Sequence, residues 1–180
     1  VAGLSLLLLA AWAAAAPAAA AVCTPVVQWT WDGNVRSPIY PEACVTPLVV
    51  ELTDDDGDGR IDTSDVPDVV FIHSNGSSYT GLVTAVDGLT GAEHWTTSVA
   101  NLVKPTALAA GDLDGDGLVD LVAIAADLTS IVCFSNTGAF KWQSLPGPVP
   151  LYEFDAIGIA DLDQDGSPEV FVGGSVWNAD

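Results

Sequence analysis

Short apolar runs separated by polar turns fill the chain beyond residue 46. In the middle of the chain they cover residues 107–110, 120–125, 130–134 and 139–143, and before it residues 47–52, 69–73, 82–86 and 93–97. Runs of this length, rich in Val, Ile, Leu and aromatic residues, are typical of β-strands. No stretch beyond residue 22 keeps apolar residues at the helical spacing. The pattern therefore predicts an all-β fold.

Two separate motifs repeat along the chain with nearly the same period. Residues 107–122 (ALAAGDLDGDGLVDLV) align without a gap with residues 156–171 (AIGIADLDQDGSPEVF), at an offset of 49. Residues 90–95 (TGAEHW) recur at 137–142 (TGAFKW), at an offset of 47. Self-similarity at such a period indicates one supersecondary unit that is repeated and stacked on its neighbours.

Four short strands in each repeat of about 50 residues predict β-propeller blades, each a four-stranded antiparallel sheet. We expect repeats at about 47–98, 105–145 and 154–180 within a domain spanning 47–180, with the last repeat truncated. Two to three blades cannot close a ring, so we expect a partial ring from a longer protein. Residues 26–32 of a segment spanning 22–46 resemble an outer strand without its own blade, and could close the full ring.

The acidic residues are concentrated in three places. The formal net charge is −20, and fifteen of the 24 Asp and Glu residues lie within residues 54–68, 112–120 and 161–169. A phosphate backbone would be repelled by this charge, which argues against a nucleic-acid partner. Polar turns rich in Asp and Gly are one interpretation of the three stretches. Clustered carboxylates that would otherwise repel one another favour a bound cation instead.

Each acidic stretch has acids at positions 1, 3 and 5 and glycine at position 6, as in loops that wrap around Ca²⁺. Position 7 would supply a backbone carbonyl, and a further acid would close the shell. The candidate ligands of the second and third loops are Asp112, Asp114, Asp116, Leu118, Asp120, Asp161, Asp163, Asp165, Ser167 and Glu169. We expect about three calcium sites.

The first loop is longer, and its candidate ligands are Asp54, Asp56, Asp58, Arg60, Asp62, Asp65 and Asp68. Taken alone it matches a twelve-residue EF-hand or dockerin loop. The flanking sequence is extended in character, so we interpret it as the same hairpin loop with an insertion. Asp68 would then correspond to Asp120 and Glu169, while the residue that closes the site stays open among Asp62, Asp65 and Asp68.

These loops resemble the FG-GAP or VCBS repeats of integrin-type β-propellers. Residues 160–170 (ADLDQDGSPEV) are close to the family pattern, and the resemblance covers about residues 45–180. It implies calcium held in hairpins between the first two strands of a blade, with the ligands named above. The repeated tryptophans, Trp95 and Trp142, are expected to pack between neighbouring blades.

The N-terminus has the features of a secretory signal. Residues 3–22 carry no charge, residues 6–10 are apolar, and Ala19 and Ala21 offer a cleavage site, so we assign residues 1–21 to a signal peptide. A transmembrane anchor is the alternative, since about 20 apolar residues can span a bilayer. We expect a secreted or cell-surface protein without membrane insertion after cleavage. A Cys23–Cys44 disulfide fits that compartment, with Cys133 left buried and inert; three reduced thiols are the alternative.

No nucleophile elbow, phosphate loop or histidine-rich metal cluster occurs in the sequence, and we expect no enzyme activity. The predicted function is that of a calcium-binding scaffold for binding or adhesion, with an unknown extracellular protein or glycan as its partner. The alternative is the non-catalytic propeller region of an extracellular hydrolase or lyase.

Overall fold

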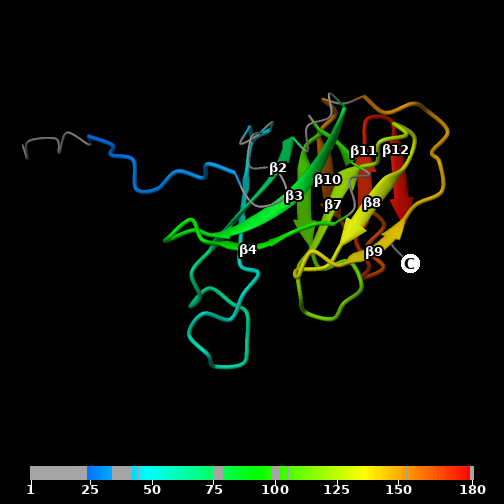
Figure 1. Ribbon diagram of the computed structural model, residues 1–180. Helices are drawn as coiled ribbons and strands as arrows, with labels where there is room; N and C mark the ends of the chain where they lie inside the picture. Colours follow the sequence, from blue (N-terminus) through cyan, green and yellow to red (C-terminus); the bar gives the residue numbers. More distant parts are fainter. Residues whose placement is uncertain are drawn as a thin grey trace, which may run out of the picture.

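The computed structural model describes residues 24–33, 42–43, 45–74, 79–98, 102–104, 106–152 and 154–178. In this part of the chain the regular elements are all β-strands, with no helix. The strands form three antiparallel sheets that follow one another in sequence and stand side by side (Figure 1). The predicted all-β fold of repeated antiparallel blades is confirmed.

The first sheet has the strand order β1-β2-β3-β4. Its strands are β1 (Leu48–Val50), β2 (Asp68–Ser74), β3 (Thr80–Asp87) and β4 (Glu93–Thr96). A further two-residue strand, β5 (Leu102–Val103), pairs with the start of β3, beyond the end of β4. The sequence did not predict β5. A bridge between Leu102 and Ala125 then ties this short strand to the second sheet.

The second sheet repeats the same order, β6-β7-β8-β9, and the third has three strands, β10-β11-β12. The second is built from β6 (Leu108–Gly111), β7 (Asp120–Ile124), β8 (Ile131–Phe134) and β9 (Phe140–Gln143). The third is built from β10 (Ile157–Ala160), β11 (Glu169–Val172) and β12 (Ser175–Asn178). These sheets are two complete blades and the first three strands of another, which is a partial propeller.

The sheets pack face to face through two apolar cores, and β7 belongs to both. Leu121 and Ala123 point into the core shared with the first sheet, whereas Val122 and Ile124 point into the core shared with the third. All four side chains are fully buried. Because successive side chains of a strand point to opposite faces, a middle blade must be apolar at every position of its inner strands. This explains the continuous run LVAIA after Asp120.

The tryptophan of each complete blade's turn motif marks the contact to the next blade. Trp95 on β4 lies over Gly138 in the turn between β8 and β9 and donates a hydrogen bond to the Asn136 carbonyl. The predicted inter-blade packing of Trp95 is thus confirmed. Trp29, in the segment before the first sheet, makes the same kind of contact with Gly91, although residues 24–33 contain no strand.

Cys133 lies in β8, fully buried and unbridged. Burial raises the pKa of its thiol to about 12, and the nearby Asp120 charge adds to the effect. The predicted inert thiol fits this environment. The predicted signal peptide and the Cys23–Cys44 disulfide lie outside the described residues. Over the residues that the structure does describe, no helix has the length and apolar character to cross a membrane.

Candidate metal centres

The three acidic loops occupy the same place in each blade. Each connects the innermost strand to the second: β1 to β2, β6 to β7, and β10 to β11. Figure 1 shows them projecting from the same edge of the three sheets. Since strands flank the first loop on both sides, it is not an EF-hand. The interpretation of a hairpin loop with an insertion is the one that agrees with the fold.

The acid at position 1 organises each loop by accepting backbone hydrogen bonds. Asp112 accepts the N–H groups of Gly115 at 2.8 Å and Gly117 at 2.9 Å, and Asp54 does the same for Gly57 and Gly59. In the third loop Asp161 accepts from Asp165 and Gly166. The glycines at position 6 have φ between 84° and 99°, a left-handed conformation that a β-carbon disfavours.

The acid at position 5 accepts the N–H group of position 7 in every loop. Asp58 bonds to Arg60, Asp116 to Leu118 and Asp165 to Ser167, each at 2.8 Å. The three residues predicted to offer a backbone carbonyl therefore stand at equivalent points of the three turns. The alternating acids and the glycine thus produce one recurring turn.

In each loop the structure brings three carboxylates together, with one oxygen of each within 4.8 Å of the others. The groups are Asp54, Asp56 and Asp65; Asp112, Asp114 and Asp116; and Asp161, Asp163 and Glu169. The other predicted acids, Asp58, Asp62, Asp68, Asp120 and Asp165, fall outside these groups. Three sets of oxygen donors of this kind could each hold a metal ion.

In the first loop Asp65 joins the group, and Asp68 does not. The Asp65 carboxylate turns into the loop, where it accepts the N–H groups of Asp62 and Asp55, both at 2.8 Å. The hydrogen bond from Asp62 is the main reason that the pKa of Asp65 lies below its ordinary value. The Ser64 hydroxyl lowers the pKa of Asp62 in the same way. The insertion therefore brings its own acid into the loop.

The acid that begins the second strand of each blade is buried and fastens the loop to the sheet. Asp68, Asp120 and Glu169 are 0%, 2% and 6% exposed. One oxygen of each accepts a backbone N–H from a leucine near the start of the loop: Leu52 at 3.0 Å, Leu113 at 3.3 Å and Leu162 at 2.7 Å. Asp68 thus stands where Asp120 and Glu169 stand in their own blades.

The other oxygen of this buried acid differs between blades. In the first blade His94 Nε2 lies 2.7 Å from Asp68 Oδ1, and in the second Lys141 Nζ lies 2.8 Å from Asp120 Oδ1. In the third blade Glu169 Oε1 is buried without a hydrogen-bond partner. Sequence reasoning missed this relationship. The signal that could have found it is the position of His94 and Lys141, each directly before the repeated tryptophan.

Lys141 also reaches into the second metal group. Its Nζ lies 2.6 Å from Asp114 Oδ2, and this hydrogen bond lowers the pKa of Asp114. Partial burial of Lys141 acts to lower its own pKa, but the hydrogen bonds to Asp114 and Asp120 outweigh burial and raise the pKa above its usual range. Lys141 is therefore a permanent cation that shares a carboxylate with the loop.

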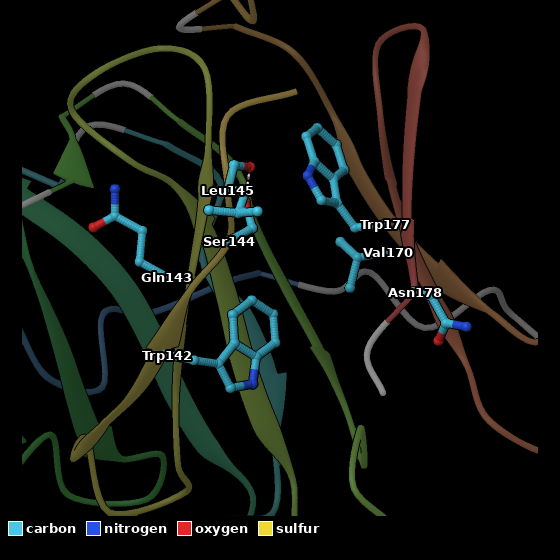
Figure 2. Close-up of a pocket in the computed structure, with 7 residues that line it drawn as sticks. All are labelled: Trp142, Gln143, Ser144, Leu145, Val170, Trp177 and Asn178. Carbon is cyan, nitrogen blue, oxygen red and sulfur yellow. Dashed lines mark hydrogen bonds between the residues drawn. The ribbon is translucent and has the colours of Figure 1, made fainter. Parts of the chain in front are cut away.

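A cleft of about 470 Å³ lies between the second and third blades. Figure 2 shows Trp142, Gln143, Ser144 and Leu145 along one side, opposite Val170, Trp177 and Asn178. Trp177 pairs with Val170 as Phe134 pairs with Leu121 in the blade before. Trp142 and Trp177 both pack against the apolar core that the second and third blades share. The cleft therefore corresponds to an inter-blade contact.

Comparison with known proteins found a family match over part of the chain and a similar solved structure. Residues 112–172 match the FG-GAP-like repeat family. The chain is also similar to a solved structure, the V. cholerae biofilm matrix protein Bap1, with 32% identity and a TM-score of 0.70 over 84% of this chain. The matched region is 26% of that chain, so this protein spans about a quarter of its relative's length. No curated protein sequence matched.

Proposed function

We propose that this chain, whose residues 112–172 form an FG-GAP-like repeat, is the calcium-binding propeller part of an extracellular scaffold of the adhesion type. Calcium would have a structural role, fixing the loops at one edge of the blades. The proposal assigns no catalytic residue. Export by the N-terminal signal peptide and a protein or glycan partner belong to the same proposal.

The observation that carries the calcium proposal is the gathering of three carboxylates in each of the three equivalent loops. In the third loop Glu169 is 6% exposed and lies in a group with Asp161 and Asp163. Carboxylates this close repel one another, and burial of one of them raises the cost. A cation bound by the three acids would remove it. The residues present therefore fit a metal ion.

The chemistry of the donors supports calcium over softer metals. The groups that the structure gathers contain only carboxylate oxygens, with no histidine or cysteine among the described residues that compose them. Ca²⁺ prefers six to eight oxygen ligands in flexible loops, whereas Mg²⁺ demands a tight octahedron and zinc favours nitrogen and sulfur. The glycine-containing turns provide the flexible kind of site.

The scaffold part of the proposal is supported by the similarity to a biofilm matrix protein and by the repeat family. Both favour an extracellular setting in which free Ca²⁺ is plentiful, and extracellular calcium sites have dissociation constants of about 0.1–1 mM. The loops would therefore bind Ca²⁺ outside the cell and hold none before export. Rigid loops at one edge of a propeller would present a defined surface to a partner.

Calorimetric titration with Ca²⁺, combined with thermal unfolding in Ca²⁺ and in chelator, tests the proposal. We expect saturable binding and a higher melting temperature in Ca²⁺, because a ligand that binds only the folded state stabilises it. Glu169→Gln should remove binding at the third loop, while the matched change Glu51→Gln, outside the three groups, should leave it intact. Absence of heat and of any thermal shift in a folded chain would show that the acidic loops are solvated turns.

A further inference from the structure

The residue before each repeated tryptophan points at the buried acid of its own blade. His94 precedes Trp95 and contacts Asp68, and Lys141 precedes Trp142 and contacts Asp120. The two strands that carry them, β4 and β9, are the outer strands of the two complete blades. One position of the outer strand therefore decides what neutralises the acid at the base of the loop.

In the second blade this residue is a cation that the protein itself provides. Lys141 Nζ bonds to both oxygens of Asp120, at 2.8 and 2.9 Å, and to Asp114 at 2.6 Å. Asp114 is one of the three acids of the second metal group. An ammonium group at this distance competes with a bound cation in two ways, since it takes up a ligand oxygen and repels positive charge.

In the first blade the residue at the same position contacts no member of the metal group. His94 lies 2.7 Å from Asp68, which falls outside the group of Asp54, Asp56 and Asp65. Apart from His94, the ion pairs of loop acids in the described part of the chain all involve Lys141. The first and second loops thus differ in whether a cation of the outer strand contacts a member of the metal group.

From this difference we infer that Lys141 is an affinity-determining residue: its tethered ammonium competes with Ca²⁺ for Asp114, so that the second loop binds Ca²⁺ more weakly than the first. The inference rests on the proposed calcium function. It adds that the outer strand of a blade sets the affinity of that blade's loop through the residue before its tryptophan. A loop with a complete acidic motif is therefore not a strong site when lysine stands at that position.

The test is an NMR titration of the chain with Ca²⁺ that follows the backbone amides of each loop. In the unaltered chain Gly59 and Arg60 of the first loop should saturate at about tenfold lower Ca²⁺ than Gly117 and Leu118 of the second loop. Lys141→Met should strengthen the second loop by about tenfold and leave the first unchanged. Lys141→Arg keeps the charge, so the second loop should stay weak.

The outcomes separate the inference from the function on which it rests. If no loop responds to Ca²⁺, the proposed calcium function is wrong, and the inference falls with it. If Ca²⁺ binds but the second loop saturates together with or before the first, Lys141 does not control affinity. The same holds if Lys141→Met binds as the unaltered chain does. Should Lys141→Met fail to fold because Asp120 loses its partner, the saturation order in the unaltered chain still decides.

Discussion

The indole of Trp95, on the outer strand of the first blade, lies against Gly138 in the second blade. Its Nε1 donates a hydrogen bond of 3.0 Å to the Asn136 carbonyl in the same turn. Gly138 has φ of 74°, so glycine is favoured here both for its conformation and for the absence of a side chain. The repeated TG-x-x-x-W motif is therefore the two halves of an inter-blade contact, the glycine of one blade meeting the tryptophan of the blade before.

Replacing Gly138 by alanine should weaken this contact severely. A β-carbon there would overlap the Trp95 ring, and the left-handed backbone would be strained as well. We expect Gly138→Ala to lower the free energy of unfolding by about 2–4 kcal/mol, measured by urea denaturation in chelator. Gly115→Ala is the matched control, with the same φ of 74° and open space around it, and should lose only about 1 kcal/mol. Equal losses would mean that the ring contact contributes nothing.

Trp29 should be needed to hold the N-terminal segment on the first blade. It contacts Gly91 and donates a hydrogen bond of 3.0 Å to the Gly88 carbonyl. Trp29→Ala should reduce the free energy of unfolding by about 1–3 kcal/mol, because an aromatic contact and a hydrogen bond are lost. Val27, 83% exposed, gives the control, since Val27→Ala should change stability by less than about 0.5 kcal/mol. Equal melting temperatures for the two variants would contradict the docking of this segment.

Gln164 should be a point of strain in the third loop. It has φ of 65°, whereas the equivalent positions of the other loops are Gly57 and Gly115. Gln164→Gly should raise the free energy of unfolding by about 0.5–1 kcal/mol, because relief of left-handed strain exceeds the entropy cost of glycine. Gln164→Ala keeps the strain and should bring no gain. Chemical denaturation in chelator measures both, and a loss of stability in the glycine variant would contradict the argument.

Asp127 should make stability depend on pH at the acid end. Burial acts to raise its pKa, but hydrogen bonds from the Ser130 hydroxyl and from the Thr129 and Ser130 N–H groups outweigh it and hold the pKa below 3.8. The charged form is therefore stabilised by folding above pH 3.8, and this contribution is lost as pH falls through the folded-state pKa.

We expect the melting-temperature difference between the unaltered chain and Asp127→Asn to shrink as pH falls from about 5 to about 3. The measurement is thermal unfolding in chelator, so that protonation of the calcium loops does not enter through ligand binding. The aspartate lies outside the three metal groups, which makes it a clean probe. A difference that is constant across this range would show that the Asp127 charge does not contribute.

The strands and the loops could be predicted from sequence because they depend on local patterns that the repeat shows twice. The alternating acids before Gly117 and Gly166 and the TG-x-x-x-W motif each have one physical explanation wherever they occur. β5 could not be predicted in this way. Its two residues have no pattern of their own and form a strand only because β3 extends beyond the end of β4.

The pairing of the outer strand with the buried acid escaped prediction for a different reason. His94 and Lys141 are unlike residues at one position, so the comparison of repeats hides their common role. The choice among Asp62, Asp65 and Asp68 was also open in the sequence, since all three acids follow Gly59 at plausible spacing. In the fold Asp68 begins β2 and is held at the sheet, whereas Asp65 turns into the loop and joins the group of carboxylates.

The direction of the tryptophan contacts has a consequence for how the chain emerges from the ribosome. Trp95 and its acceptor Asn136 are 41 residues apart, and the tryptophan always comes first. After the four strands of a blade have been synthesised, most of another repeat must therefore follow before the tryptophan of its outer strand can bond to its acceptor. Folding during synthesis would proceed with a constant lag, the newest blade always unfinished at one edge and completed only by the arrival of its successor.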